Sequence, residues 1–132
     1  MKNIIIALTL MFVACGTPPK DTKLKNVSDF IVVHTPQPFE KVTGTLVIKG
    51  EAKGNYFFEA DFPVEVVLEN GEVIQHYAMA DDEWMTEEFV PFTSTIDISG
   101  LEPQDVIIKL HRNNPSDNRE NDMVMELPVT ID

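Results

Sequence analysis

Hydrophobic and polar residues alternate along most of the chain after residue 30, which is the pattern of β-strands with one buried face. The clearest case is a pair of β-rich runs, residues 63–69 and 72–80, that flank Asn70 and Gly71. An Asn-Gly pair between two such runs is the strongest short-range signal for a β-hairpin. We therefore predict a central hairpin. Every second residue of its first strand would be buried, namely Val64, Val66 and Leu68.

The charges beside Asn70 and Gly71 constrain the turn. A strict two-residue turn would place Glu69 opposite Glu72, and directly opposed like charges are unfavourable. A longer loop with Gly71 in the left-handed conformation, as a bulge, avoids that contact. The sequence favours this loop. A one-residue shift of register in it would move every later side chain of the strand to the opposite face of the sheet.

Further runs with strand character occupy residues 30–34, 42–50, 89–98, 106–111 and 123–131. The aromatic stretch 56–62 is either an irregular strand or a loop folded over one end of the core. About seven short strands, with turn residues between them and no helical period longer than about two turns, predict an all-β, immunoglobulin-like antiparallel β-sandwich. An up-and-down barrel is the alternative.

Two proline positions indicate where strands lie on an edge. Pro36 and Pro38 end the first run, which we interpret as an edge strand. Pro128 lies within the last run and cannot donate a hydrogen bond to a neighbouring strand. The last strand should therefore lie on an edge at Pro128 or carry a bulge there.

The composition fits one domain and excludes some partners. The chain has 132 residues, 43% of them hydrophobic, which is enough for a single core. Its formal net charge of −12 comes from 22 acidic and 10 basic residues. A surface this acidic repels polyphosphate, so nucleic acid is not expected as a partner. The single cysteine cannot form an intramolecular disulfide.

The first fourteen residues predict a lipoprotein signal peptide. Lys2 precedes an apolar run of about eleven residues, which is too short for a membrane-spanning helix of roughly 20 residues. The stretch Phe12-Val13-Ala14-Cys15 resembles the bacterial lipobox, in which the cysteine is lipidated and becomes the first mature residue. This resemblance implies that Cys15 anchors the protein to the bacterial cell envelope. Because Gly16 rather than aspartate follows, it further implies sorting to the outer membrane if the host has one.

Residues 15–28 are predicted to be the lipidated cysteine and a flexible stalk, with the sandwich at 29–132. The stalk contains Pro18, Pro19 and a group of lysines and shows no periodicity. Residues 16–28 would span about 20 Å as a random coil. The lysines could contact acidic lipid or be a solvated linker.

Several short motifs, taken in order, resemble a known family. They are Thr35-Pro36-Gln37-Pro38, Leu46-Val47-Ile48-Lys49-Gly50-Glu51-Ala52, Phe57-Phe58-Glu59, Asn70-Gly71, Glu83-Trp84 with Phe92, Asn114-Pro115-Ser116 and Leu127-Pro128-Val129. Together they resemble the GerM-associated immunoglobulin-like domain of bacterial spore-germination and envelope proteins, over about residues 30–131. The resemblance implies an immunoglobulin-like sandwich on a secreted or lipid-anchored protein. It supplies no catalytic residue.

The candidate ligand-binding residues lie in predicted loops. Trp84 and Tyr56 belong to an aromatic set that would either close the ends of the core or stack on a glycan or peptide. Asn114, Ser116 and Asp117 belong to the polar loop 113–122. These five residues are the predicted binding positions.

No metal site or cofactor is expected. Asp81, Asp82 and Glu83 are weak calcium candidates, because calcium takes six to eight oxygen ligands and a solvated acidic loop has the same composition. The three histidines lie in three different predicted strands without zinc-site spacing. No nucleophile motif or phosphate-binding loop is present.

Three functions follow as hypotheses. The first is a lipid-anchored envelope protein whose immunoglobulin-like domain is a binding or accessory module for a protein or glycan partner, and which is not an enzyme. The second is a hydrolase inhibitor that presents the loop 113–122. The third is a hydrolase with paired carboxylates, which requires two acids in one concave pocket.

Overall fold

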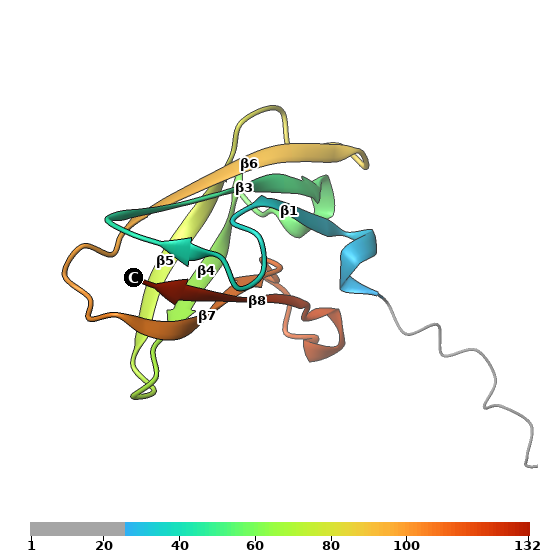
Figure 1. Cartoon of the computed structure of the whole chain (residues 1–132). Coiled ribbons are helices and arrows are strands. Elements are labelled where there is room, and N and C mark those ends of the chain that lie inside the picture. The colour runs from blue at the N-terminus through green and yellow to red at the C-terminus, as the bar shows by residue number, and fades with distance from the viewer. Residues whose placement is uncertain (1–25) are drawn as a thin grey trace, which may run out of the picture.

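The computed structural model describes residues 26–132, and the chain forms strands joined by loops and short 3-10 helices (Figure 1). The strands are β1 (Ile31–Thr35), β2 (Lys41–Val42), β3 (Thr45–Lys53), β4 (Asp61–Val67), β5 (Val73–Ala80), β6 (Phe89–Asp97), β7 (Gln104–His111) and β8 (Val124–Ile131). The 3-10 helices are η1 (Val27–Asp29), η2 (Gly54–Tyr56) and η3 (Arg119–Asn121). None of the helices in this described part is long and apolar enough to span a bilayer.

The strands form one curled sheet in the order β1-β3-β6-β5-β4-β7-β8-β2. All neighbours are antiparallel except β2 and β8, which are parallel. Over the described residues β1 and β2 form the two ends of the sheet, so the sheet does not close into a barrel. This confirms the predicted all-β fold.

The sheet folds into two layers at the seam between β5 and β6. These strands pair only at Met79–Thr93 and Ala80–Phe92. Beyond that point side chains bridge the seam, because the hydroxyl of Ser94 donates to the Tyr77 carbonyl at 2.9 Å and His76 Nε2 bonds the Thr95 carbonyl at 2.8 Å. One layer therefore holds β1, β3 and β6, and the other holds β5, β4, β7, β8 and β2.

The central hairpin is confirmed, including its longer loop. Leu68 N–H donates to the Glu72 carbonyl at 2.8 Å, and Gly71 N–H donates to the Leu68 carbonyl at 3.0 Å. Gly71 has a φ of +88°, the left-handed conformation that favours glycine. Val67 then pairs with Val73, and the alternate residues of β4 from Phe62 to Val66 are buried as the pattern requires.

The prediction of one continuous strand over residues 42–50 was wrong. The chain turns at Gly44, which has a φ of +69°, and Thr45 N–H donates to the Thr43 carbonyl at 2.8 Å. This turn sends Val42 into β2, beside β8, while the residues after Gly44 form β3 beside β6. Alternation continues across the turn, so hydrophobic pattern alone does not reveal it.

The aromatic stretch 56–62 is mainly a loop. Gly54 opens η2 and lies beneath another loop, since a Cβ placed on it would be 1.8 Å from the Thr86 carbonyl oxygen. Glu59 and Ala60 have φ values of +52° and +68°, which ends regular pairing before β4 begins at Asp61.

The core lies between the two layers. Buried aromatic rings close one end of it: Tyr56 and Phe62 meet edge to face at 5.1 Å between ring centroids, and Phe62 and Phe92 at 5.0 Å. The Tyr56 hydroxyl donates to the Leu110 carbonyl at 2.6 Å, and burial raises the pKa of this phenol above its ordinary value. The aromatic set thus serves chiefly as core, with Phe58 and Phe89 partly exposed.

The last strand is on an edge only locally at Pro128, because β8 lies between β7 and β2, and β2 pairs with it only at Thr130 and Ile131. The residues just before β2 also bond β8 on its outer side: Phe39 N–H donates to the Pro128 carbonyl at 2.7 Å, and Thr130 N–H donates to the Glu40 carbonyl at 2.9 Å. Pro128 therefore accepts a bond on that side and has no donor to satisfy.

A short ordered segment precedes residue 29 in the described chain. Asn26 caps η1 by accepting a hydrogen bond from Ser28 N–H at 3.2 Å, and Val27 and Phe30 pack against the core. The predicted signal peptide 1–14, Cys15 and the first part of the stalk lie outside the described residues.

Candidate functional site

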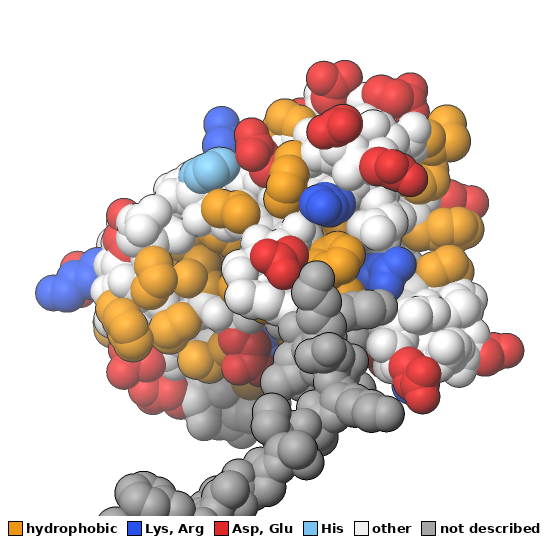
Figure 2. All heavy atoms as spheres, turned by 90° about the vertical axis from the view of Figure 1, so that its right-hand side faces the viewer, with side chains coloured by type: hydrophobic (Ala, Val, Ile, Leu, Met, Phe, Trp, Pro, Cys, Tyr) orange, Lys and Arg blue, Asp and Glu red, His pale blue; other side chains and the backbone are white. Residues whose placement is uncertain are grey.

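Strand register brings three loops together at the end of the domain where the described chain begins. Ile31 pairs with Ala52, Lys53 with Phe89, and Asp61 with Met79. The end of β7 and the start of β8 follow at the same end. The loops there are 54–60, 81–88 and 112–123 (Figure 1). Figure 2 shows this end, where acidic side chains gather in the upper part with hydrophobic ones between them.

A row of side chains crosses the outer face of the larger layer and leads to the loop 112–123. Tyr77 on β5 pairs with Pro63 on β4, and His111 on β7 pairs with Val124 on β8. Tyr77 is 54% exposed. The row therefore offers an exposed aromatic ring beside Pro63, and Pro63 in turn borders a cavity.

This cavity, which we call the loop-end pocket, has a volume of about 440 Å³. Its lining comes from β4, from the end of β7, and from the loop and start of β8: Pro63, Glu65, His111, Arg112, Asn113, Asn114, Arg119, Asp122, Met123 and Val124. His111 Nε2 donates a hydrogen bond to the Glu65 carboxylate, and both side chains are partly buried. The volume is within the range of small-molecule and cofactor sites.

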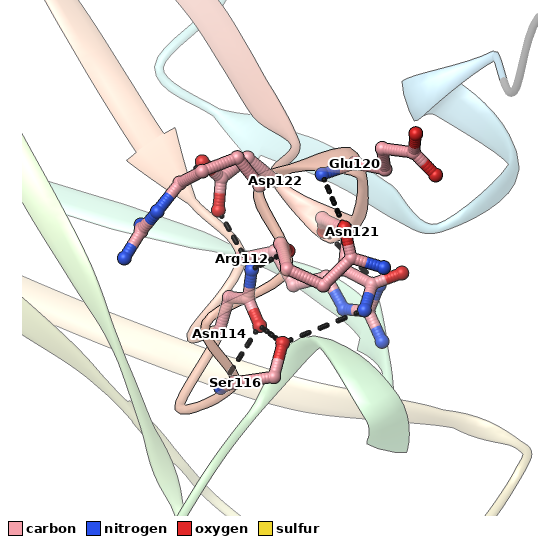
Figure 3. A network of polar contacts seen from close by, with 8 residues as sticks. Arg112, Asn114, Ser116, Glu120, Asn121 and Asp122 are labelled. Atoms are coloured by element: carbon pink, nitrogen blue, oxygen red, sulfur yellow. Dashed lines mark hydrogen bonds and ion pairs between the residues drawn. The ribbon is translucent and has the colours of Figure 1, made fainter.

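The loop that walls the pocket is held by its own side chains (Figure 3). The Asn114 amide donates to the Asn118 carbonyl at 3.0 Å and to the Asp122 carboxylate at 2.8 Å. The Asn114 side-chain oxygen accepts from the Ser116 hydroxyl at 2.6 Å. Asn118 caps η3 by accepting from Glu120 N–H at 3.1 Å. The loop's shape is therefore supported by its own hydrogen bonds.

Two residues at the end of β7 fix this loop to the neighbouring loop 54–60. Arg112 Nε donates to the Asn55 carbonyl at 2.9 Å, and its Nη1 donates to the Asn121 carbonyl at 3.2 Å. The Asn113 amide donates to the Asp61 carboxylate at 3.1 Å and to the Phe58 carbonyl at 3.3 Å. These bonds tie the two loops to each other and to the strand ends.

Comparison with known families decides the domain type. A family model described as the immunoglobulin-like domain of bacterial spore germination, Gmad2, matches residues 30–119. The chain belongs to this family. The family is a non-catalytic domain type that serves as an accessory or binding module. A comparison with curated proteins gives no match.

The structure brings only some of the predicted binding residues together in this immunoglobulin-like domain. Asn114 lines the loop-end pocket, and Ser116 and Asp117 lie exposed farther along the same loop. Trp84 is half-buried against the core in the loop 81–88 and does not line the pocket. Tyr56 is 0% exposed, so it cannot stack on a ligand, because its ring and hydroxyl are both used in the core.

The weak calcium candidates use their oxygens locally. Asp81 accepts from the Thr93 hydroxyl at 2.6 Å, Asp82 accepts from Glu83 N–H at 2.7 Å, and Glu83 accepts from Met85 N–H at 3.3 Å. Within residues 26–132, no group of three or more His, Cys, Asp or Glu side chains is arranged to hold a metal ion.

Sequence reasoning missed Tyr77, Glu65 and His111 as members of one surface. The Asn70-Gly71 hairpin signal could have placed Tyr77 opposite Pro63, because the loop length fixes the register of β4 and β5. The approach of His111 to Glu65 depends on the pairing of β4 with β7, which are far apart in the sequence. No local pattern reports that pairing.

The pocket lining combines charged groups of both signs with a few apolar residues. Glu65 and Asp122 are balanced by Arg112 and Arg119, and Arg119 lies 3.6 Å from the Asp122 carboxylate. Such a lining suits a polar ligand without a large net charge, which donates and accepts hydrogen bonds and covers Pro63 and the neighbouring Tyr77 ring.

Proposed function

We propose that this protein is a lipid-anchored accessory protein of the bacterial cell envelope, and that its immunoglobulin-like domain holds a protein or glycan partner at the loop-end pocket. The observation that carries the proposal is the pocket itself. Its wall is shaped by the Asn114 hydrogen bonds before any partner arrives, which lowers the ordering cost of binding.

The proposed anchor is Cys15. Ten residues, 16–25, separate it from Asn26, where the described chain begins. A linker of this length spans about 17 Å as a random coil. A diacylglyceryl cysteine supplies two acyl chains, which stable anchoring requires. The mature chain has lost Lys2, so its side-chain charge is 9 − 22 = −13, which would keep the domain from lying on an anionic membrane.

The proposed partner is recognised by stacking and hydrogen bonding. The exposed Tyr77 ring gives a flat apolar face, and aromatic faces pack well against sugar rings and peptide side chains. Arg119 supplies donors in the adjoining pocket, and Glu65 and Asp122 supply acceptors. Asn114 shapes the wall and is not a donor to the partner, because both of its amide N–H groups bond Asn118 and Asp122. A glycan and an extended peptide both meet these requirements.

Crosslinking from intact cells tests this proposal. The lipidated protein is crosslinked and purified, and mass spectrometry identifies the captured molecules. We expect enrichment of an envelope protein or of cell-wall glycan fragments, with at least a fivefold loss for Tyr77→Ala and for Arg119→Ala. Both side chains are exposed, so these variants should fold.

The matched control is Val47→Ala, which removes a partly exposed apolar side chain from β3 in the other layer. Capture that is equal for all three variants would contradict a role of the pocket. Full recovery of a Cys15→Ser chain in the membrane fraction would contradict the anchor and leave the pocket result intact.

A second candidate function is inhibition of a hydrolase by the loop 113–122. It is favoured by the hydrogen bonds that hold this loop within itself. Inhibitory loops gain affinity when they are held in the bound conformation. Limited proteolysis distinguishes the cases: an inhibitor loop should resist cleavage within residues 113–122, and Asn114→Ala should become susceptible because it loses both amide donors. Rapid cleavage of the unaltered loop would exclude this candidate.

The paired-carboxylate hypothesis meets its geometric condition, since Glu65 and Asp122 line one pocket. Both carboxylates already accept hydrogen bonds, Glu65 from His111 and Asp122 from Asn114. The family is a non-catalytic domain type. Binding is therefore the function that we propose.

A further inference from the structure

A second row on the outer face of the larger layer is apolar throughout. The register places Val73 beside Val67, Val67 beside Ile107, and Ile107 beside Pro128. These residues lie on four adjacent strands, β5, β4, β7 and β8. A row of charged residues on the central strands, Glu65, Lys109 and Glu126, separates it from the row that leads to the loop-end pocket.

The apolar row contains a groove of about 300 Å³, which we call the sheet groove. Its lining is almost entirely apolar apart from a short acidic rim: Phe39, Val67, Leu68, Glu69, Asp105, Val106, Ile107, Pro128, Val129 and Thr130. It shares no lining residue with the loop-end pocket. The two cavities are therefore separate sites.

Phe39 lines one side of the sheet groove with an exposed side chain and a left-handed backbone. Its side chain is 77% exposed, and its backbone φ is +66°, a left-handed conformation that is an outlier for a bulky residue. The bond from Phe39 N–H to the Pro128 carbonyl at 2.7 Å holds this backbone in place. A large apolar ring that is neither buried nor relaxed contributes little to the fold, and such outliers cluster at ligand-binding positions.

The charge around the sheet groove defines its partner. Glu69 and Asp105 line it, and Glu65, Lys109 and Glu126 lie one row away. Lys41 on β2 pairs with the lining residue Thr130 and follows Glu40, so the acids near the groove still outnumber the bases. The Glu69 carboxylate accepts from Asp105 N–H at 3.2 Å, which keeps both acids at the rim. A second copy of this acidic chain would bring like charges together. A partner that carries positive charge beside an apolar group would be attracted.

We propose that the sheet groove binds a basic peptide segment of another protein. A bulky apolar side chain of the segment packs between Phe39, Ile107 and Pro128, and a neighbouring lysine or arginine pairs with Glu69 and Asp105. This site is independent of the loop-end pocket, so the two can be occupied together.

Peptide selection tests the proposal. A random peptide library is selected on the soluble mature chain with Cys15→Ser, in the presence and absence of Phe39→Gly as a competitor in solution. We expect the selected peptides to carry a bulky apolar residue flanked by lysine or arginine. Because Phe39→Gly should not bind these peptides, adding it in solution should not reduce their enrichment. Enrichment of acidic or uncharged sequences, competition by Phe39→Gly, or no enrichment at all would overturn the proposal.

Fluorescence anisotropy of one enriched peptide then separates binding from folding. Glycine accepts a positive φ, so Phe39→Gly should keep the thermal unfolding midpoint within a few degrees. The same variant should lower the affinity for the peptide at least tenfold. The double variant Glu69→Gln with Asp105→Asn removes both charges but keeps a side-chain oxygen acceptor at each position. It should lower the affinity for the peptide at least fivefold at low salt and by a smaller factor at high salt.

Val47→Ala on the other layer is the control and should bind as the unaltered chain does. Tyr77→Ala should also bind normally, which distinguishes this site from the loop-end pocket. Equal affinity for Phe39→Gly and the unaltered chain would overturn the proposal. So would concentration-dependent dimerisation that the peptide abolishes, because a second copy would then be the occupant.

Discussion

The Tyr56 hydroxyl is a polar group buried in the aromatic end of the core, and its one acceptor is the Leu110 carbonyl at 2.6 Å. We predict that Tyr56→Phe lowers the free energy of unfolding by about 1–3 kcal/mol, because the carbonyl loses its partner in a dry environment. Urea denaturation measures the change. Tyr77→Phe is the matched control and should change it by less than about 0.5 kcal/mol, since Tyr77 is exposed. Equal effects would contradict the assignment of Tyr56 to the core and Tyr77 to the surface.

Hydrogen bonds within one exposed turn lower the pKa of Asp97. The Ser99 hydroxyl at 2.6 Å and then the Ser99 backbone N–H at 2.9 Å hold the pKa of Asp97 below its ordinary value of 3.8. The bonds therefore favour the folded state above that ordinary value, and the contribution is lost as the pH falls through the lowered pKa. We predict that Asp97 titrates at a higher pH in Ser99→Ala than in the unaltered chain. NMR of the Asp97 side chain over a pH series measures this. Ser99→Thr keeps the hydroxyl and should retain most of the shift.

Among the elements, the loop 81–88 depends on a glycine in another loop. A Cβ on Gly54 would lie 1.8 Å from the Thr86 carbonyl oxygen and 2.4 Å from that of Trp84. We predict that Gly54→Ala displaces this loop and costs about 1–3 kcal/mol. Trp84 is the single tryptophan, so its emission should shift to longer wavelength as it leaves the core surface. Gly100→Ala has open space around its Cβ and should change neither observable, whereas an unchanged spectrum in Gly54→Ala would contradict the docking of the loop.

The same elements show how far the sequence alone leads. Alternation and the Asn70-Gly71 signal were sufficient for the hairpin and its loop, because both depend on neighbouring residues. The break at Gly44 was missed because the hydrophobic pattern continues through it. The loop 113–122 was predicted as polar, but its pocket depends on Glu65 and His111, which meet only when β4 pairs with β7. The sheet groove arises from register across four strands in the same way.

On the scale of the whole molecule, the two proposed sites differ in their distance from the proposed anchor. The loop-end pocket lies at the end where Asn26 begins the described chain, whereas the β4–β5 hairpin and the loop 98–103 lie at the other end (Figure 1). With the proposed anchor at Cys15, a linker of about ten residues would keep the first end close to the membrane. The loop-end pocket would then receive partners near the bilayer, and the sheet groove would be open to partners farther from it.

This orientation predicts unequal access to two introduced thiols. Asp117→Cys lies on the loop 112–123 and Glu102→Cys on the loop at the far end, and both positions are exposed. In isolated membranes, a polymer-linked maleimide should label Asp117→Cys several-fold more slowly than Glu102→Cys, because the bilayer obstructs the bulky reagent. A small maleimide should label both equally, as should the bulky reagent when Cys15→Ser releases the chain. Equal labelling by the bulky reagent in membranes would show that the linker lets the domain turn freely, and the pocket would then have no preferred side for its partner.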